Sequence, residues 1–549
     1  MSDSQRNDRV AGEHAAHAEP LPETGTEIDA RSPGERAPAV STKSTTLRWA
    51  GFAGGLVLAL ALYLLLPGEV PHAARVTAAI AGLMAVWWMT EALPIPATAL
   101  VPLVAFPVLT PLVPDPETGE EVAVTVSSIG ASYGSSTIFL FMGGFLIALA
   151  MQRWNLHRRI ALVILSFMGE RTEMMILGFM IATGFLSMWV SNTATAVLML
   201  PIGLSVLLLV NEAMEKAGAA RMSEDASEEE KNEHVLKSRF GTALMLGIAY
   251  AASIGSVGTI IGTPPNTFLV GYLAEEHGIS IGFGQWMAVG VPLAIVMMAI
   301  AWFLLVKVLF KPEVAHIPGG RELIRKELRE LGAMSTGEML VLGLFVLAAA
   351  SWILIPTIFE DPFIDDAGIG LLIGLLMFLV PGGAARGVRL LDWETAVKMP
   401  WGVLLLFGGG IALSSMFGDS GLTLWIGDVS EGLGVLPVVL LVAVFVALII
   451  FLTEITSNTA TAATFVPVIG GVALGIGADP LLLTVPVALA ATFAFMLPVA
   501  TPPNSVAYGT GYVSIAQMVR GGVWLNLIGI VLVTAVTLTL AVWFLGIQL

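Results

Sequence analysis

The amino-acid sequence predicts an all-α polytopic membrane protein, and three observations support that fold class. Only 12% of the 549 residues are charged and 56% are hydrophobic, whereas soluble proteins carry roughly 25% charged residues. The apolar residues form runs close to the roughly 20 residues that a helix needs to cross a bilayer. β-Barrel strands would instead alternate polar with apolar residues. Examples of the apolar runs are Trp49–Leu66, Leu340–Ile355, Val435–Leu452 and Val523–Leu545.

The first 46 residues differ from the rest of the chain, because they are polar and contain no apolar run. Such a segment buries too little apolar surface to offset the chain entropy that folding removes. It also lacks the apolar core of a signal peptide. We therefore expect residues 1–46 to form a disordered cytoplasmic tail.

The charges of the connecting segments predict the orientation. If the tail is cytoplasmic and the first spans lie near 49–66, 74–91, 93–113 and 135–152, only Arg75 among all Lys and Arg residues falls outside. Three segments on the opposite side, Pro114–Glu121, Ala274–Gly278 and Glu360–Asp366, carry acids and neither Lys nor Arg. This asymmetry agrees with the positive-inside rule. The compact loops favour the inner membrane of a bacterial cell as the location.

An internal repeat divides the spanning part of the chain into two halves. The hexapeptide Ser-Asn-Thr-Ala-Thr-Ala occurs at 191–196 and again at 457–462, an offset of 266 positions (191 to 457). At the same offset, Gly143-Gly144 matches Gly409-Gly410, and Ser187 matches Thr453. Identical hexapeptides with flanking partners in register indicate a duplication.

A second motif, Thr-Pro-Pro-Asn, follows Gly262 and again follows Ala500. Ser191 precedes Thr263 by 72 positions and Ser457 precedes Thr501 by 44, and the extra 28 are close to the length of a polar insertion at 211–238. The halves therefore match once this insertion is removed. The expected organisation is a first half over 47–310 with the cytoplasmic insertion, a cytoplasmic linker over 311–337 and a second half over 338–549.

Both motifs predict helix breaks at membrane depth. Ser, Asn and Thr side chains bond to nearby backbone groups and favour caps and turns, and Pro-Pro removes two N–H donors and clashes with the preceding helical turn. Inside a bilayer, broken backbone is tolerated only where it lines a cavity or is buried in protein. Paired breaks in corresponding positions of two halves are typical of a transporter's binding site.

Helix breaks of this kind can bind an anion and a cation side by side. Helix N-termini expose free N–H groups and a partial positive charge, which attract carboxylates. Helix C-termini and unwound carbonyl groups offer oxygens to a hard cation such as sodium. Small polar residues also join helices to one another, but that role does not explain two hexapeptides that each have a Thr-Pro-Pro-Asn partner.

These motifs resemble those of the divalent anion/sodium symporter family, which includes sodium-coupled dicarboxylate, citrate and sulfate carriers. The resemblance covers roughly residues 48–549. It implies about 11 transmembrane helices plus two re-entrant helical hairpins, with tips at 191–193 and 457–459, in an inverted-repeat elevator-type transporter. It also implies a homodimer embedded in the lipid bilayer.

The resemblance also implies the residues of the site. The substrate would be bound by Asn192, Thr193, Thr263, Asn458, Thr459, Thr501 and Pro502. One sodium ion would be held around Ser187, Ser191, Asn192 and Gly262, and a second around Thr453, Ser457, Asn458 and Ala500. The two halves would then grip opposite ends of a dicarboxylate. Both tips end in Thr, as in similar dicarboxylate carriers, which disfavours sulfate.

The function expected from these residues is sodium-coupled symport of di- or tricarboxylates such as succinate, malate or fumarate. A sodium-independent dicarboxylate exchanger and a sodium/sulfate symporter are the alternatives. No Lys, Arg or His lies within the four motifs, which favours sodium coupling. A channel would suit a charged ring better, and the chain carries none of the motifs of common intramembrane enzymes. We expect neither enzymatic activity nor a nucleic-acid partner.

Three acidic or aromatic features receive structural interpretations. Glu454 lies three residues before Ser457 in an apolar context, where an ionisable side chain is costly. We expect it to cap or brace the hairpin, and tuning of sodium or proton coupling is the alternative. Glu91 is predicted to lie in an interfacial turn, and the Met and Phe residues of Phe139–Phe145 are predicted to serve packing.

Overall fold

The computed structural model describes residues 42–114, 120–216, 238–317, 319–359 and 361–548. Most of the predicted tail and residues 217–237 of the predicted insertion lie outside these ranges. Helix α1 begins at Thr42, so residues 42–46, which we expected to be unstructured, are helical. From Leu47 onward the chain forms one compact unit.

The chain before the first hexapeptide is helical except for one short hairpin of two antiparallel strands, in which Val113 pairs with Val122. Its elements are α1 Thr42–Leu65, α2 His72–Thr90, α3 Ile95–Thr98, α4 Val101–Leu109, β1 Leu112–Pro114, β2 Glu121–Ala123, α5 Val126–Ala131, η1 Ser132–Gly134, α6 Ser136–Arg153 and α7 Leu156–Ser166.

The first copies of both motifs lie in the next group of helices. These elements are α8 Thr172–Ser187, α9 Asn192–Lys216, α11 Arg239–Ser256, η2 Ile260–Gly262, α12 Pro264–His277, α13 Phe283–Phe303 and η3 Leu304–Leu309. They are followed by α14 Gly320–Glu330, α15 Thr336–Ile358, α16 Asp366–Leu379, α17 Trp393–Ala396, α18 Trp401–Asp419, α19 Leu422–Ser430 and η4 Glu431–Val435.

The second copies repeat the order of the first. The elements are α20 Val438–Thr453, α21 Asn458–Gly475, α22 Pro480–Ala491, α23 Pro502–Gly509, α24 Ile515–Val536, η5 Thr537–Ala541 and α25 Val542–Leu545. Each half therefore contains a helix pair interrupted at the hexapeptide, and then a helix interrupted before Thr-Pro-Pro-Asn. Helices α9, α12, α21 and α23 begin at the residues of these motifs.

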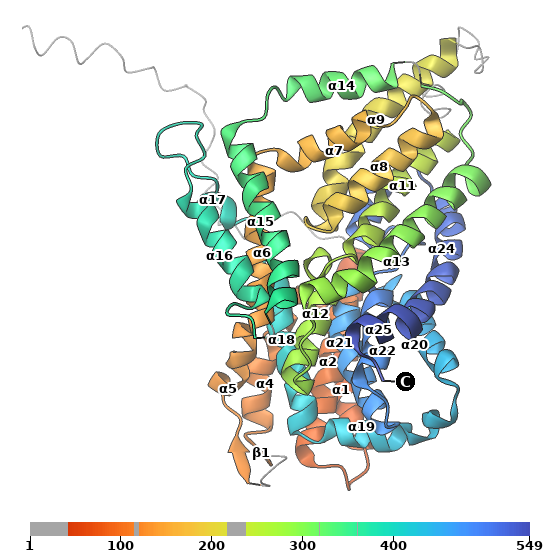
Figure 1. The fold of residues 1–549 in the computed structure, drawn as a ribbon. Helices are drawn as coiled ribbons and strands as arrows, with labels where there is room; N and C mark the ends of the chain where they lie inside the picture. The colour runs from red at the N-terminus through yellow and green to blue at the C-terminus, as the bar shows by residue number, and fades with distance from the viewer. Residues whose placement is uncertain (1–41, 115–119, 217–237, 318, 360, 549) are drawn as a thin grey trace, which may run out of the picture. The chain divides into compact units, whose positions relative to one another are not determined.

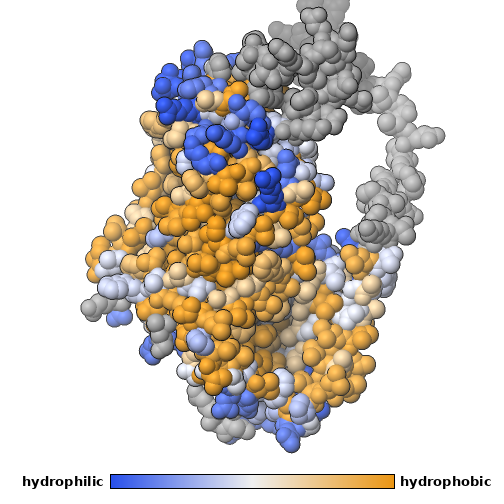
Figure 2. All heavy atoms as spheres, turned by 90° about the vertical axis from the view of Figure 1, so that its right-hand side faces the viewer, coloured by the Kyte–Doolittle hydropathy of each residue, from blue (hydrophilic) through white to orange (hydrophobic). Residues whose placement is uncertain are grey.

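Nine helices of the described residues are long and apolar enough to cross a membrane, and five shorter apolar helices accompany them. Figure 2 shows the corresponding surface, on which hydrophobic residues cover the middle of the molecule and hydrophilic residues gather toward its two ends. Helix, not strand, supplies nearly all of the regular structure in the described ranges. These observations confirm the all-α polytopic fold class.

The helices before the two tips are short. Helices α8 and α20 have 16 residues each, or about 24 Å at a rise of about 1.5 Å per residue, which is less than the roughly 30 Å hydrocarbon core. Each contacts the helix that follows its tip, α8 with α9 and α20 with α21. The two pairs thus have the form of helical hairpins that turn back inside the membrane.

The matched glycine pairs of the repeat have a packing role. A Cβ atom at Gly143 would overlap the backbone of Gly370, and one at Gly409 would overlap the backbone of Ala99. Glycine therefore lets α6 approach α16 and lets α18 approach the end of α3 at backbone distance. This close packing holds the helices around the two hairpins in a fixed arrangement.

Candidate functional site

One cavity of about 670 Å³ joins the two halves of the chain. Ten of the thirteen residues predicted for the site line it, namely Ser191, Asn192, Thr193, Gly262, Thr263, Ser457, Asn458, Thr459, Ala500 and Pro502. The other three, Ser187, Thr453 and Thr501, are buried and do not line it. The structure therefore brings together motifs that lie as far apart in the sequence as residues 191 and 502.

Four helices begin at this cavity. Asn192 and Asn458 are the first residues of α9 and α21, and Pro264 and Pro502 are the first residues of α12 and α23. The first N–H groups of a helix have no partner inside it, and they carry a partial positive charge. The dipoles of four such ends give the cavity a positive electrostatic character without a Lys or Arg side chain, although α12 and α23 begin with two prolines, which carry no N–H.

The two tips use their Asn side chains differently. In the first tip, the Asn192 Oδ1 atom accepts a hydrogen bond from the Thr193 backbone N–H at 2.9 Å, and Ser191 Oγ accepts one from the Ala194 N–H at 3.3 Å. In the second tip, Asn458 Oδ1 accepts from the Thr453 hydroxyl at 2.8 Å. In the first tip these bonds occupy two N–H groups of the first turn of α9, and in the second tip the bond joins the first residue of α21 to the end of α20.

Ser187 and Thr453 lie behind the tips in equivalent positions. The Ser187 hydroxyl donates to the Ala252 carbonyl at 2.6 Å. The single proton of the Thr453 hydroxyl is shared between the Ala491 carbonyl at 2.9 Å and Asn458 Oδ1 at 2.8 Å. Each bond to a carbonyl joins the end of the first hairpin helix to the helix that precedes the broken segment of the same half. The register of 266 positions between Ser187 and Thr453 thus corresponds to one repeated contact.

The Asn of each Thr-Pro-Pro-Asn motif braces the broken segment before it. The Asn266 side-chain amide donates to the carbonyls of Val257 and Thr259 at 3.3 and 2.9 Å. The Asn504 amide likewise donates to the carbonyls of Ala494 and Leu497, both at 3.1 Å. Carbonyls that have lost their helical partners are satisfied in this way.

The opposite face of each of these Asn side chains is unsatisfied. Asn266 Oδ1 and Asn504 Oδ1 are buried, and neither has a hydrogen-bond partner in the described part of the protein. A buried acceptor without a partner costs roughly 1–3 kcal/mol. Sequence analysis did not select these two residues, although their place at the end of a repeated motif was a usable signal.

Glu454 braces the second broken segment through its carboxylate. It accepts hydrogen bonds from the backbone N–H groups of Phe495, Met496 and Leu497 at 2.7, 2.9 and 3.0 Å. The Asn526 side-chain amide donates a fourth at 2.7 Å. Glu454 is 3% exposed, so its cost of burial is offset by four donors. These contacts agree with the bracing role expected for Glu454.

Some residues from outside the repeated motifs also line the cavity. Phe141 and Phe145 pack edge to face at 4.4 Å between ring centroids, as expected of packing residues, and both also line the cavity. Glu91 lines it too, at the left-handed C-terminal cap of α2 with a φ of 48°. We interpreted Glu91 as an interfacial turn, and its position at the cavity is decided by how α2 packs. None of the described lining residues is Lys, Arg or His.

Comparisons with known proteins agree with this fold and site. The chain is 42% identical over 503 residues to the sodium-dependent dicarboxylate transporter SdcS of Staphylococcus saprophyticus, which covers 90% of this chain and 91% of the relative. The protein of the same name from Staphylococcus aureus strain USA300 is 40% identical over 501 residues, with the same coverage.

Among solved structures, MtrF of Neisseria gonorrhoeae, described as one of a class of antimetabolite efflux pumps, superposes with a TM-score of 0.52. The match covers 89% of this chain and 97% of that chain at 12% identity, and so concerns the fold alone. A family model described as the sodium:sulfate symporter transmembrane region matches residues 46–547. The protein is therefore a multi-pass membrane transporter that belongs to the sodium:sulfate symporter family.

Proposed function

We propose that the protein is a sodium-coupled symporter of di- or tricarboxylates such as succinate, malate or fumarate. The single observation that supports this most is the convergence of four helix N-termini and both hairpin tips on one cavity of about 670 Å³. The relatives named sodium-dependent dicarboxylate transporters support the same substrate class.

The repeated arrangement suits a substrate with two anionic ends. Asn192, Thr193 and Thr263 of the first half would bind one carboxylate, and Asn458, Thr459 and Pro502 of the second half would bind the other. Thr501 would act indirectly, because its buried hydroxyl accepts from the Asn504 backbone N–H at 3.3 Å and so caps α23. Backbone N–H groups at helix N-termini bind carboxylates without a fixed cation.

Sodium ions would bind behind the tips and neutralise part of the substrate charge. One would lie around Ser187, Ser191, Asn192 and Gly262, and the other around Thr453, Ser457, Asn458 and Ala500. The unpartnered Oδ1 atoms of Asn266 and Asn504 add one buried oxygen acceptor to each half, and hard cations prefer oxygen ligands. Without a fixed cation among the lining residues, sodium would balance the charge of the transported anion.

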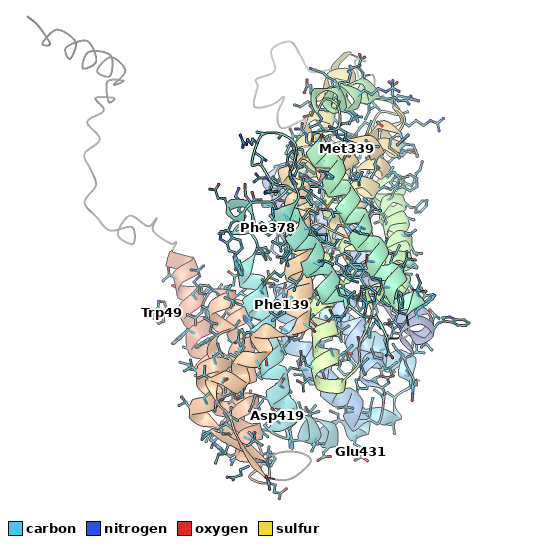
Figure 3. All side chains as sticks on the ribbon, turned by 60° about the vertical axis from the view of Figure 1, so that its left-hand side comes forward. Trp49, Phe139, Met339, Phe378, Asp419 and Glu431 are labelled. Atoms are coloured by element: carbon cyan, nitrogen blue, oxygen red, sulfur yellow. The ribbon has the colours of Figure 1, made fainter. Side chains whose placement is uncertain are left out.

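We also propose an orientation with the N-terminus in the cytoplasm of a bacterial cell. Arg158 pairs with Glu327 at 2.7 Å and Arg159 with Glu338 at 2.7 Å, so α7 is joined to the basic segment that contains α14. Figures 1 and 3 show α14 and Met339 toward one end of the compact unit and the acidic residues Asp419 and Glu431 toward the other. That distribution fits the positive-inside rule. A homodimer with elevator-like movement in the bilayer completes the proposal.

Uptake of radiolabelled succinate into proteoliposomes tests the function. An inward sodium gradient should drive accumulation, and an equal potassium gradient should not. Uptake that needs only internal succinate, without sodium, would instead identify an exchanger. The family model's description makes sulfate the second substrate to measure, and sodium-driven sulfate uptake without succinate uptake would replace the proposed substrate class.

A further inference from the structure

A second cavity lies away from the binding cavity and shares no lining residue with it. It has a volume of about 560 Å³ and lies between α8, α11 and α13. Its size is within the roughly 300–1,000 Å³ of pockets that hold small organic ligands. We refer to it as the α8–α13 groove.

The lining of the α8–α13 groove excludes water as a stable occupant. None of the described residues that line it is charged, and its side chains are aliphatic, methionine or aromatic. The indole N–H of Trp189 is the sole N–H or O–H among these side chains, and it has no hydrogen-bond partner in the described part of the chain. An ordered water molecule needs about 2–4 polar partners, and this lining does not supply them.

The mouth of the groove continues the lipid-facing surface of the protein. Ile181 and Phe185 of α8 are each 40% exposed and Ile295 of α13 is 63% exposed, and all three line the groove. Residue 295 lies near the middle of the apolar span Phe283–Leu309, at the depth of the hydrocarbon core. Helix α13 lies on the side of Figure 1 that faces the viewer in Figure 2, where hydrophobic residues predominate.

We propose that the acyl chain of a bilayer phospholipid binds in the α8–α13 groove. At this depth the protein is surrounded by the acyl chains of the lipids. The apolar wall of the groove is continuous with the outer surface of α13, which these chains contact. A lipid chain fills such a space, because an empty cavity forfeits the dispersion contacts of its lining. This proposal depends on the membrane location of the helices and does not depend on which anion is transported.

The bound chain would support the first hairpin tip. Met188 and Trp189 line the groove and are separated from Ser191, where the tip begins, by Val190 alone. The Thr259 hydroxyl of the broken segment donates to the Met188 carbonyl. Helices α8 and α11 meet at Gly184 and Gly255, which also line the groove. An acyl chain in this place would pack against the connection that holds the tip and the broken segment together.

Photolabelling of the reconstituted protein tests the proposal. The full chain is placed in phosphatidylcholine vesicles that contain a trace of phosphatidylcholine with a diazirine near the end of one acyl chain. After irradiation, mass spectrometry maps the labelled residues, and labels are expected on α8 and α13 at the groove. Ala299→Phe fills the groove and should reduce this labelling about tenfold, equivalent to about 1.4 kcal/mol. Val296→Phe, on the exposed face of α13 outside the groove, should leave it unchanged.

Two results would overturn the proposal. Equal labelling of α8 in the Ala299→Phe and Val296→Phe proteins would show that lipid touches α8 without entering the groove. The second result uses the absence of cysteine from the sequence: efficient disulfide formation between copies of Ile295→Cys in vesicles would make a second copy of the chain the occupant. Ala294→Phe fills the groove from another lining position, and it serves if Ala299→Phe elutes as aggregate in size-exclusion chromatography.

Discussion

The two halves of the protein carry the same motifs, and in both an Asn amide donates to carbonyl groups of the broken segment, but each half adds a different second support. In the first half, donors satisfy carbonyl groups: the Trp286 indole N–H and the Asn266 amide both donate to the Val257 carbonyl. In the second half an acceptor, the Glu454 carboxylate, satisfies three backbone N–H groups. The position that corresponds to Glu454 at the offset of 266 is Met188 (454 to 188).

This difference shows that the motif that breaks a helix can be repeated without repeating the side chains that hold the broken segment in place. The motif determines where a helix breaks, because Pro-Pro and the capping side chains act locally. The support depends on which backbone groups the break leaves unpaired and on which helices lie beside them. In the second half, α24 approaches closely enough that a Cβ atom at Gly522 would overlap the backbone of Phe495, and Asn526 reaches Glu454 from the same helix.

The largest expected effect concerns what the halves share. Asn192→Ala or Asn458→Ala should reduce succinate uptake at least about 100-fold, because each Asn would bind both substrate and sodium and a hydrogen bond to a charged group contributes about 1.5–3 kcal/mol. Size-exclusion elution should be unchanged. Thr464→Val is the matched control, since the Thr464 hydroxyl of α21 has no hydrogen-bond partner in the described residues. Normal uptake by both Asn variants would remove the tips from the site.

The next prediction separates the two supports. Glu454→Leu leaves three backbone N–H groups and the Asn526 amide without their acceptor, and it should lower the free energy of unfolding by about 3–5 kcal/mol. The matched change in the first half, Met188→Leu, should cost less than about 1.5 kcal/mol. Denaturant unfolding in detergent measures both. Equal losses would mean that the carboxylate brace adds nothing to the second half.

Glu454→Gln distinguishes bracing from a role in coupling. The amide keeps one oxygen acceptor at nearly the same place, so the half-saturating sodium concentration for uptake should stay within about twofold of the unmodified protein if Glu454 only braces the hairpin. A large change in that concentration, with unfolding little affected, would favour the alternative in which Glu454 tunes sodium or proton coupling.

A smaller effect is expected at the residue before Thr-Pro-Pro-Asn, where the two halves differ in the room available for a side chain. A Cβ atom at Gly262 would overlap the Ser256 carbonyl oxygen, whereas Ala500 already carries a Cβ atom at the matching position before Thr-Pro-Pro-Asn. Gly262→Ala should therefore cost about 1–3 kcal/mol through overpacking and weaken sodium-dependent uptake. Ala500→Gly should cost about 1 kcal/mol or less. A larger loss from Ala500→Gly would reverse the comparison.

The smallest effect concerns the C-terminal end of α12. Glu276 lies in its last turn and has no counterpart at the end of α23. Burial is the largest cause that raises the pKa of Glu276 to about 7; the hydrogen bond with the Ser415 hydroxyl lowers it, and the nearby carboxylates of Asp419 and Glu275 add to the rise. The folded protein thus holds a proton that the unfolded chain releases near pH 4.5, so this group's contribution to stability is lost as pH rises toward about 7.

Glu276→Gln removes this dependence and serves as the test. Relative to the unmodified protein, the variant's melting temperature should rise between pH 5 and pH 8, by an amount that corresponds to on the order of 1–2 kcal/mol. Glu275→Gln is the comparison: Glu275 is exposed and makes the smallest of the contributions to the pKa of Glu276, so this variant should keep most of the pH dependence. If the melting temperatures of Glu276→Gln and the unmodified protein differed by the same amount at every pH in this range, Glu276 would not be the source of the pH dependence.

Much of the fold and of the site follows from local and periodic features of the sequence. The apolar runs predict the spans, since their length is set by the bilayer. The duplicated hexapeptide and the two Thr-Pro-Pro-Asn motifs predict the four breaks, and the structure begins α9, α12, α21 and α23 at those residues. The resemblance to a transporter family, based on the same motifs, agrees with the family match over residues 46–547.

The tertiary structure decided what depends on helices that are distant in sequence. The placement of Glu91 and Phe141 at the cavity, the paired role of Asn266 and Asn504, and the groove beside α13 arise from how separate helices pack. By itself the sequence determined where the helices run and where they break, because those preferences act over a few residues. Which unpaired backbone groups meet a carboxylate or an indole was settled only by packing, since the side chains that complete these contacts lie 29 to 72 positions away.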